Sequence, residues 1–483
     1  MTEPTMPNDY PEGSFSADVP APASDALLGA LETEAIAYDV STLTRASHGR
    51  DWWPLSIYDV AHGTVPHWPG VVVRATSTSD VSTVMKIASD LQISVTAQGG
   101  RSGVVGGAVA PTGAIALDMT GLSRIVGVDT VSGTVRVEAG VFGPELEHYV
   151  QELGWTVGHF PQSFDLATVG GWIACRGAGQ YSNRYGKIED IVRGLTVVLA
   201  NGDVVELAGR GPRQAVGPDL MQLFVGSEGT LGIITEATLA MHPLAPYEQR
   251  AAYSFTTFAE GLDACRRIMQ RDARPAVLRL YDEVESQRNF EIGECALIVL
   301  DEGDQLLVEA TMKIVDHECR TATGLDTGLV ARWLEHRNNV GQLAPLWENG
   351  IVVDTIEVAG PWVTLAPMYE KVTAALKSID GVLIASVHQS HAYIDGACLY
   401  FTFAGKPEGD HTAFYRRAWD AASSTVLECG GALSHHHGVG RNRARFVRAA
   451  LGSGYPLLAS LKSELDPLDV LNPGALGIGG KPW

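Results

Sequence analysis

Three consecutive histidines stand near the carboxyl end of the sequence, in the run Ser434-His435-His436-His437-Gly438. The pKa of histidine lies near neutrality, so such a run suits proton transfer from a substrate carbon or hydroxyl group. A metal site and a solvated polar loop are the alternatives, and we favour proton transfer. The stretch from His388 to Gly396 supplies two more imidazoles, those of His388 and His391.

Glycine clusters form a second group of candidate residues. The loop Gly99-Gly100-Arg101-Ser102-Gly103 offers backbone N–H groups that no side chain shields, which suits a pyrophosphate. It matches neither the GxGxxG nor the P-loop pattern, and by itself a simple glycine turn is the stronger interpretation. Further clusters at residues 161–186 and 226–235 favour a dinucleotide site over a simple turn, because two glycine-rich turns in one domain can hold one dinucleotide from both sides.

The order of these clusters, GGRSG, then PQS and TVGGW, then GSEGTLGIIT, resembles the FAD-binding domain of the vanillyl-alcohol oxidase and p-cresol methylhydroxylase superfamily. Covalent flavin in that superfamily often uses a histidine in the first loop; this chain has Arg101 there, so we expect dissociable FAD. The resemblance implies that Gly99 to Gly103 bind the pyrophosphate. It implies an FAD site made by Gly99, Gly100, Arg101, Ser102, Gly103, Pro161, Ser163, Thr168, Gly170, Gly171, Arg176, Gly179, Glu228, Gly229, Ile233 and Ile234.

A closer resemblance, to the alkyldihydroxyacetonephosphate synthase branch, covers nearly the whole chain through ATVGGW, YGKIEDIV, VLRLYD, GACLYF and GGALSHHHGVG. That branch is redox-neutral: FAD forms an adduct with an acyl-dihydroxyacetone phosphate, and a fatty alcohol replaces the fatty acid. Carried over by motif, Tyr400 and His435 to His437 are acid/base groups and Arg279 is a substrate-side cation. From its strand-like context alone, Arg279 can equally pair with Asp282.

One position departs from that branch, because His388 stands where the branch has an arginine. A neutral imidazole is a weak phosphate ligand, which counts against a phosphorylated substrate. The same segments resemble the D-2-hydroxyacid dehydrogenases, whose HxGDGNxH and SxEHG segments bring a divalent metal to the substrate; here His436 replaces the glutamate. His388, His391 and His436 can bind Zn²⁺ in principle, but we favour hydrogen bonds to substrate and expect no metal.

Composition narrows the function classes. A formal net charge of −21 disfavours nucleic acid as a partner. The six cysteines are scattered singly, and the N-terminus carries acid and proline, which indicates a cytoplasmic protein with reduced thiols. No apolar run is long enough to span a membrane, although a lipid substrate can be collected at a membrane surface. We also expect a homodimer.

The elements that must position these residues are mixed strands and helices, which predict an α+β fold. Strands are expected at 71–75, 93–97, 115–119, 135–139 and 296–300, a hairpin over 195–207, and helices after Ser79-Asp80, after Pro144 and over 258–270. The inward faces are predicted to include Leu91, Tyr149 and Leu153. The chain is divided into a disordered tail (1–24), an N-terminal helical arm (25–67), a PCMH-type FAD-binding domain (68–245), a cap or substrate domain (246–425) and a C-terminal segment (426–483) that folds back on the flavin domain.

The leading hypothesis is an FAD-dependent oxidoreductase that acts on an alcohol or a 2-hydroxyacid, with hydride passing to flavin N5. The alternative is a redox-neutral alkyldihydroxyacetonephosphate synthase with a lipid substrate. A non-catalytic flavin-binding protein is the third class, and it does not require titratable groups clustered beside a flavin.

Overall fold

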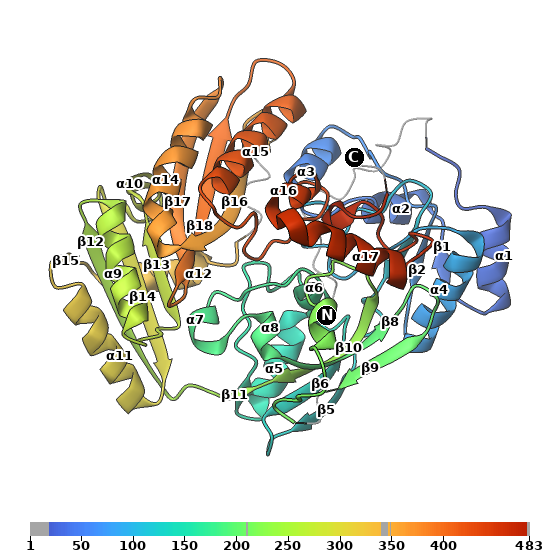
Figure 1. Ribbon diagram of the computed structural model, residues 1–483, viewed down its shortest axis with the longest axis horizontal. Coiled ribbons are helices and arrows are strands. Elements are labelled where there is room, and N and C mark those ends of the chain that lie inside the picture. The colour runs from blue at the N-terminus through green and yellow to red at the C-terminus, as the bar shows by residue number, and fades with distance from the viewer. Residues whose placement is uncertain (1–18, 209–210, 340–345, 348, 481–483) are drawn as a thin grey trace.

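Figure 1 presents the protein as a computed structural model that describes residues 19–208, 211–339, 346–347 and 349–480. Residues 1–18 of the expected disordered tail lie outside the described residues. The end of that segment is in contact with the protein, since Arg45 donates to the carbonyl oxygen of Pro20 at 3.0 Å. The arm that follows contains α1 (Asp25–Thr33), α2 (Thr42–His48) and α3 (Pro54–Ala61).

A four-stranded sheet opens the first domain, in the order β1 (Tyr38–Asp39), β2 (Val71–Arg74), β4 (Ile115–Asp118) and β3 (Val95–Gln98). The last three strands are parallel, and α4 (Thr78–Leu91) connects β2 to β3. The helix begins after Ser77 and not at Ser79-Asp80, because Ser77 and Asp80 form a reciprocal capping box. Leu91 is 37% exposed, contrary to the prediction, since it is the last residue of the helix.

A second, antiparallel sheet has the order β5 (Ile125–Asp129), β6 (Thr134–Glu138), β10 (Ile233–Ala240), β8 (Val192–Val198) and β9 (Val204–Ala208). The hairpin predicted over 195–207 is confirmed as β8 and β9. Helix α5 (Gly143–Glu152) packs through Leu146 and Val150, whereas Tyr149 and Leu153 are more than 40% exposed and were predicted wrongly. Shorter elements are β7 (Trp155–Thr156), β11 (His242–Pro243), α6 (Val169–Ala174), α7 (Ser182–Tyr185) and α8 (Ile188–Ile191).

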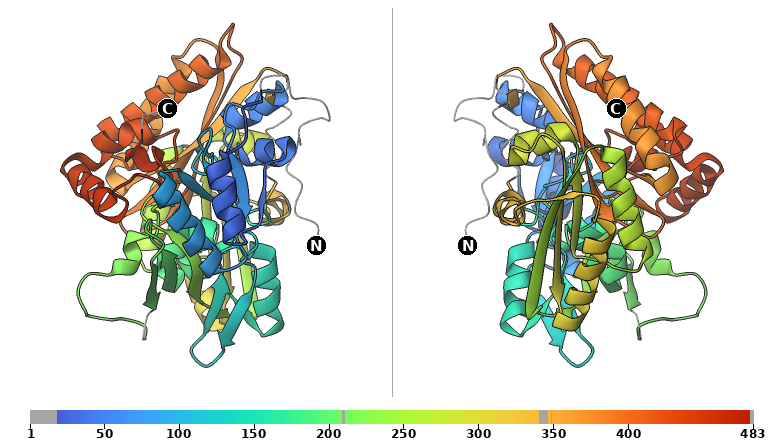
Figure 2. Two further views of the ribbon diagram at one scale, coloured as in Figure 1. Left: turned by 90° about the vertical axis from the view of Figure 1, so that its right-hand side faces the viewer. Right: turned by 90° about the vertical axis from the view of Figure 1, so that its left-hand side faces the viewer.

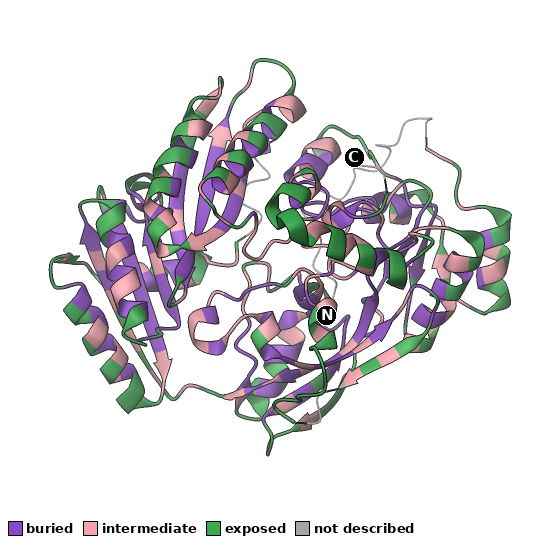
Figure 3. Ribbon diagram, in the orientation of Figure 1, coloured by how far each residue is buried: buried purple, intermediate pink, exposed green. Residues whose placement is uncertain are grey.

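The cap is built on a seven-stranded sheet in the order β15 (Thr323–Gly324), β12 (Tyr247–Phe255), β14 (Cys295–Gly303), β13 (Val277–Tyr281), β17 (Val382–Ala392), β18 (Gly396–Gly405) and β16 (Val352–Pro361). Neighbouring strands are antiparallel throughout. Its outer face carries α9 (Phe258–Gln270), α11 (Gln305–Glu318), α14 (Trp362–Lys377) and α15 (His411–Glu428), which can be followed in the right-hand view of Figure 2. Exposed residues gather on the outward side of these helices, while the strands are largely buried (Figure 3).

Strand alternation decides which cap residues face the first domain. Leu278 and Leu280 of β13 belong to the core beneath the outer helices. Val277 and Tyr281 belong instead to a cluster with Tyr181 and Tyr185 of the first domain. Because side chains of a strand point alternately to its two faces, Arg279 lies on the side of the first domain. Helices α10 (Glu283–Phe290) and α12 (Gly328–His336) are on this inner side of the cap.

The carboxyl end returns to the first domain, as predicted. Helix α17 (Tyr455–Leu465) has Pro456 in its first turn and ends before Pro467. Beyond it, Leu471 forms a parallel bridge with Val95 of β3, and Nζ of Lys462 donates to the carbonyl oxygen of Leu471 at 2.7 Å. Figure 1 shows α17 lying along the first domain, with α16 (Val447–Leu451) next to it. Within the described part of the chain, the helices are too short or too polar to cross a bilayer.

Candidate active site

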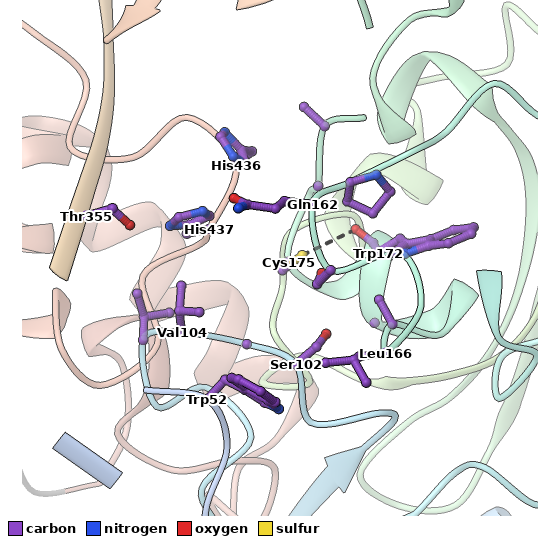
Figure 4. Close-up of a pocket in the computed structure, with 18 of the residues that line it drawn as sticks. Trp52, Ser102, Val104, Gln162, Leu166, Trp172, Cys175, Thr355, His436 and His437 are labelled. Atoms are coloured by element: carbon purple, nitrogen blue, oxygen red, sulfur yellow. Dashed lines mark hydrogen bonds between the residues drawn. The ribbon is translucent and has the colours of Figure 1, made fainter. Parts of the chain in front are cut away.

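A cavity of about 750 Å³ lies between the two domains. Its walls come from the glycine loops of the first domain, from β13, β16, β17 and β18 of the cap, and from the histidine run. Figure 4 shows His436 and His437 on one side of the cavity, with Gln162 and Cys175 opposite them and Ser102 and Trp52 below. The site therefore joins segments that are more than 300 residues apart in the sequence.

The two glycine segments that suggested a dinucleotide are packed directly against each other. A Cβ on Gly100 would lie 1.7 Å from the carbonyl oxygen of Leu166, and one on Gly99 would lie 2.2 Å from Oγ1 of Thr168. No side chain fits at either position, so glycine is required by close approach. Arg101 takes a φ of +52°, and its Nη1 lies 3.0 Å from Nε2 of His48.

Most of the predicted FAD residues line the cavity. They are Gly99, Gly100, Arg101, Ser102, Gly103, Pro161, Ser163, Thr168, Gly170, Gly171, Glu228, Gly229, Ile233 and Ile234. Arg176 and Gly179 are outside the lining: Arg176 pairs with Glu189 at 3.3 Å, and a Cβ on Gly179 would meet the backbone nitrogen of Phe160 at 2.6 Å. Both residues thus shape the second loop from behind the cavity wall.

The lining is compatible with a bound dinucleotide. A Cβ on Gly103 would meet only Oδ2 of Asp51, at 3.6 Å, and one on Gly229 would meet nothing within 4 Å. The Cβ positions of these two glycines face open space, whereas those of Gly99 and Gly100 meet protein. Backbone N–H groups beside open space are the donors that a pyrophosphate uses.

Glu228 has a contact that the sequence did not reveal. Its two carboxylate oxygens accept hydrogen bonds from the backbone N–H groups of Val439, at 2.6 Å, and Gly440, at 2.7 Å. Burial raises its pKa to about 7, against the opposing effect of these two hydrogen bonds. The first domain thus holds the backbone immediately after the histidine run.

Tyr400 and His437 form the central polar pair of the cavity. The hydroxyl oxygen of Tyr400 lies 2.8 Å from Nε2 of His437. Tyr400 is on β18, opposite His388 of β17, and the two rings stack with centroids 4.8 Å apart. Burial raises the pKa of Tyr400, so the phenol is protonated, and burial lowers the pKa of His437, so the imidazole is neutral.

His391, His435 and His436 form a second imidazole group, with candidate ligand atoms within 4.8 Å of one another. Nδ1 of His391 lies 2.7 Å from Oγ of Ser182, and Nε2 of His435 lies 2.6 Å from the hydroxyl of Tyr393. The Nδ1 atoms of His435 and His436 are 2.8 Å apart, a hydrogen-bond distance. Burial lowers the pKa of all three rings. His391 and His436 line the cavity, whereas His435 does not.

Arg279 and His388 make a third polar contact, from β13 to β17. Nη2 of Arg279 donates to Nε2 of His388 at 2.8 Å, and Nδ1 of His388 lies 3.2 Å from Oε2 of Glu285. The alternative pairing of Arg279 with Asp282 is not found, because Asp282 caps α10 and accepts from the amide of Val387. Both ring nitrogens of His388 have partners, so His388 does not join His391 and His436 in the ligand set considered for Zn²⁺. The histidine that lies with those two is His435.

Sequence reasoning missed several polar residues of the site. Glu285 and Glu357 are buried acids in contact with histidines, and Arg443 is a fully buried guanidinium. A signal existed for Glu357, since an acid inside the apolar strand Val352–Pro361 is rare without a partner. Cys175 also lines the cavity, and burial raises the pKa of its thiol to about 12.

Comparisons with known proteins cover nearly the whole chain. The model of the FAD binding domain matches residues 69–208, and that of the FAD linked oxidases, C-terminal domain, matches residues 244–476. The uncharacterized FAD-linked oxidoreductase YgcU of Escherichia coli K12 is 30% identical over 434 residues, which are 84% of this chain and 89% of that protein.

Two other relatives have named activities. Alkyldihydroxyacetonephosphate synthase of Caenorhabditis elegans is 27% identical over 96% of this chain and 85% of its own length. D-lactate dehydrogenase of Anaerostipes hadrus is 28% identical over 84% of this chain and 89% of its own length.

Among solved structures, an alkyldihydroxyacetonephosphate synthase superposes with a TM-score of 0.80 at 25% identity, over 94% of this chain and 87% of that one. Substrate-bound p-cresol methylhydroxylase has a TM-score of 0.76 at 18% identity, over 95% and 99% of the two chains. At 18% identity, the similarity to p-cresol methylhydroxylase shows a shared fold.

Proposed function

This chain belongs to the family of FAD-linked oxidases, within the vanillyl-alcohol oxidase and p-cresol methylhydroxylase superfamily, and on that basis we propose that it oxidises a hydroxyl-bearing small molecule, an alcohol or a 2-hydroxyacid. It is an FAD-dependent enzyme. The observation that carries the proposal is the hydrogen-bonded pair of Tyr400 and His437 in the cavity wall.

FAD would be held by the glycine loop Gly99–Gly103 and by the second glycine segment around Thr168, Gly170 and Gly171, which border the same cavity. When bound, it supplies the two-electron acceptor for a hydride from the substrate carbon. The first loop carries Arg101 where a covalent link would use histidine, so we propose dissociable FAD.

Tyr400 and His437 supply the proton transfer that alcohol oxidation requires. Nε2 of His437 takes the phenolic proton of Tyr400, and the phenolate takes the proton of the substrate hydroxyl group. The substrate is then poised to lose hydride from its carbon, and the enzyme retains one additional proton on His437. The 2.8 Å separation of the two groups is within the range that general acid–base catalysis needs.

Arg279 supports the 2-hydroxyacid class in particular. Its guanidinium lines the cavity, and within the described residues its hydrogen bonds go to the neutral acceptors His388 and Tyr281. A guanidinium binds a carboxylate in a bidentate, charge-assisted manner. A substrate carboxylate on Arg279 would thus lie beside His388, which stacks on Tyr400.

Redox-neutral alkyl transfer is the second candidate. Its support is the similarity to alkyldihydroxyacetonephosphate synthases, which extends over 96% of this chain. The residues used would be the same, with Tyr400 and the histidine run as acid/base groups and Arg279 as the substrate-side cation. His388 in place of an arginine weakens the support for a phosphorylated substrate.

Anaerobic mixing of the FAD-loaded protein with single substrates tests the proposal. Bleaching of the flavin absorbance by a 2-hydroxyacid or an alcohol is the expected result. Turnover of acyl-dihydroxyacetone phosphate with a fatty alcohol, and no net bleaching, would support the second candidate instead. A protein that shows no flavin spectrum after addition of FAD would contradict both.

A further inference from the structure

Glu357 occupies an unusual place for an acid. It is fully buried within β16, whose neighbours Ile356 and Val358 belong to the apolar core of the cap. In the sheet register, Glu357 lies opposite Tyr400 of β18, and Tyr400 lies opposite His388 of β17. Since a buried charge is costly unless it is paired, its partners indicate its role.

One oxygen of Glu357 holds the histidine run. Oε1 accepts from Oγ of Ser434 at 2.7 Å and from the backbone N–H groups of His435, His436 and His437 at 3.2, 3.0 and 2.7 Å. Hydrogen bonds to an ionised acceptor are about twice as strong as neutral ones. Four donors on a single carboxylate oxygen fix the loop against β16.

The other oxygen, Oε2, faces Arg443 and His437. Arg443, which is fully buried, donates to it, and Nδ1 of His437 lies 3.8 Å away. This Nδ1 is buried and makes no hydrogen bond with the described residues. A carboxylate in front of Nδ1 favours the tautomer with the proton on Nδ1, which leaves the lone pair of Nε2 for the hydroxyl of Tyr400.

The charge state of Glu357 agrees with this arrangement. Burial by itself would raise its pKa, but Arg443 and then His437 and His436 reverse the effect and hold the pKa well below its ordinary value. Burial is also the largest influence on His437 and lowers its pKa, while Glu357 acts in the opposite direction. A permanent negative charge therefore lies behind a neutral imidazole, ready to stabilise the imidazolium.

We propose that Glu357 is a positioning residue of the active site, which holds His437 in the tautomer that accepts the proton of Tyr400 and stabilises the imidazolium that results. This inference rests on the proposed function, because it adds Glu357 to Tyr400 and His437 as a third residue of the proton-transfer site. Tyr400 transfers its proton to Nε2, the proton on Nδ1 stays in place, and Glu357 remains ionised throughout. A buried acid that orients a histidine in this way can contribute several orders of magnitude in rate.

Several other titratable or charged groups lie around this trio. They are His435 and His436 of the same loop, Arg443 beyond it, Glu228 of the first domain, Cys398 of β18, His388 and His391 of β17, Arg279 of β13 and Asp354 of β16. The test must therefore distinguish the effect of the charge of Glu357 from a structural change in these neighbouring residues.

The variant Glu357→Gln keeps the shape of the side chain and removes its charge. Asp301→Asn is a matched control, because Asp301 is a buried acid of the same sheet that pairs with an arginine, Arg184 at 3.1 Å, outside the cavity lining. For Glu357→Gln we expect flavin reduction to slow by at least about 100-fold with less than about 3-fold change in substrate affinity. Asp301→Asn should reduce its flavin at the wild-type rate.

The pH profile of flavin reduction distinguishes positioning from folding. Glu357 raises the pKa of His437, so its neutralisation should move the acid limb of the profile to lower pH by about one unit. An unchanged acid limb in Glu357→Gln, or a wild-type rate, would overturn the proposal. If Glu357→Gln does not retain FAD, the pH profile of Glu357→Asp tests the proposal instead. This variant keeps the charge but places it farther from His437, so the acid limb should move to lower pH by a smaller amount than in Glu357→Gln. An acid limb at the wild-type position would overturn the proposal.

A second readout does not depend on the substrate. In ¹⁵N-histidine NMR spectra, assigned with His437→Asn, wild-type His437 should be protonated on Nδ1, and Glu357→Gln should lose this preference. If no hydroxyl substrate reduces the wild-type flavin, the proposed function fails, and the NMR result alone decides the role of Glu357. Protonation of Nε2 in the wild-type protein would overturn it.

Discussion

At the scale of single residues, the histidines of the site differ in their hydrogen-bond partners. His437 lies within hydrogen-bond distance of Tyr400 in the cavity wall, while His388 lies between Arg279 and Glu285. His391, His435 and His436 satisfy one another and their neighbours Ser182 and Tyr393. Proton transfer thus depends on the last histidine of the run, because it alone of the three makes a hydrogen bond with Tyr400.

Removal of the phenolic hydroxyl tests this assignment. In Tyr400→Phe, His437 has no group from which to take a proton, and we expect flavin reduction to slow by about 10²- to 10⁴-fold with FAD still bound. Stopped-flow absorbance under anaerobic conditions measures the rate constant. Tyr369→Phe, on the outer helix α14, is the control and should behave as wild type. Equal rates in Tyr400→Phe and wild type would rule out Tyr400 as the base.

The guanidinium of Arg279 gives a prediction about substrate class. For Arg279→Gln we expect the KM for a 2-hydroxyacid to rise by about 100-fold, because a charge-assisted pair with the carboxylate is lost. The KM for an uncharged alcohol should change little. Steady-state assays with both substrate types measure the difference, and Arg274→Gln, which removes an exposed charge of the cap, is the control. Parallel changes for both substrates would contradict a carboxylate-binding role.

The acid limb of the pH profile follows from the pKa of His437. Burial, together with Arg443, lowers this pKa below 6.5, and Glu357 only partly opposes the shift. The imidazole acts as a base when neutral, so the rate constant of flavin reduction should be level at about pH 6.5–8 and fall only at lower pH. The raised pKa of Tyr400 adds no alkaline limb in this range. A limb centred above pH 7 would show that another group acts as the base.

At the scale of elements, the cofactor loops depend on how closely two turns approach. The loop after β3 and the segment before α6 meet backbone to backbone at Gly100 and Leu166. The register of β16, β18 and β17 places Glu357, Tyr400 and His388 in one row across the cap sheet. The loop contact thus positions the residues of the proposed FAD site, and the sheet register positions the proton-transfer residues.

A methyl group at the loop contact should prevent cofactor binding. In Gly100→Ala, the new Cβ would lie 1.7 Å from a backbone oxygen, so the two loops must separate. We expect at least about a 100-fold loss in FAD affinity, or a purified protein without flavin. Gly127→Ala in β5 is the control, since nothing lies within 4 Å of its Cβ position. Fluorescence titration with FAD measures both, and wild-type affinity in Gly100→Ala would refute the packing argument.

At the scale of the whole molecule, the carboxyl end connects parts that are distant in sequence. Nδ2 of Asn472 donates to the carbonyl oxygens of Gly107, at 3.0 Å, and Glu228, at 2.8 Å. Its Oδ1 accepts from Arg441 at 3.0 Å. The last segment of the chain therefore fixes two loops that border the proposed FAD site, and Glu228 in turn holds the backbone after the histidine run.

Removal of this connection should weaken both folding and cofactor binding. For Asn472→Ala we expect the free energy of unfolding to fall by about 2–4 kcal/mol, because buried carbonyl groups lose their donor. FAD affinity should fall about 10-fold as the loops loosen. Leu468→Ala, which changes a half-exposed residue of the same segment, should have little effect. Thermal unfolding with and without FAD measures both quantities; unchanged affinity would show that the segment does not support the cofactor site.

The sequence by itself determined the glycine clusters and the α+β alternation, because these depend on local backbone demands and on short-range periodicity. The order of the glycine clusters was sufficient to indicate a resemblance to FAD-dependent enzymes. The motifs VLRLYD and GACLYF brought Arg279 and Tyr400 under consideration, and the histidine run stood out by itself. The predicted strands were found with boundaries shifted by a few residues, while Tyr149 and Leu153 were assigned to the wrong face, since burial of a helix depends on what packs against it.

Only the tertiary structure decided which histidine meets Tyr400, which imidazoles gather, and that Glu357 and Glu228 hold the same loop from two domains. The contacts of Tyr400 with His437 and of Glu228 with Gly440 join residues 37 and 212 positions apart. Their formation depends on strand register and domain packing, which a single sequence does not encode in any local pattern. A buried acid becomes interpretable once its hydrogen-bond partners are known, because the cost of burying its charge must be met by them.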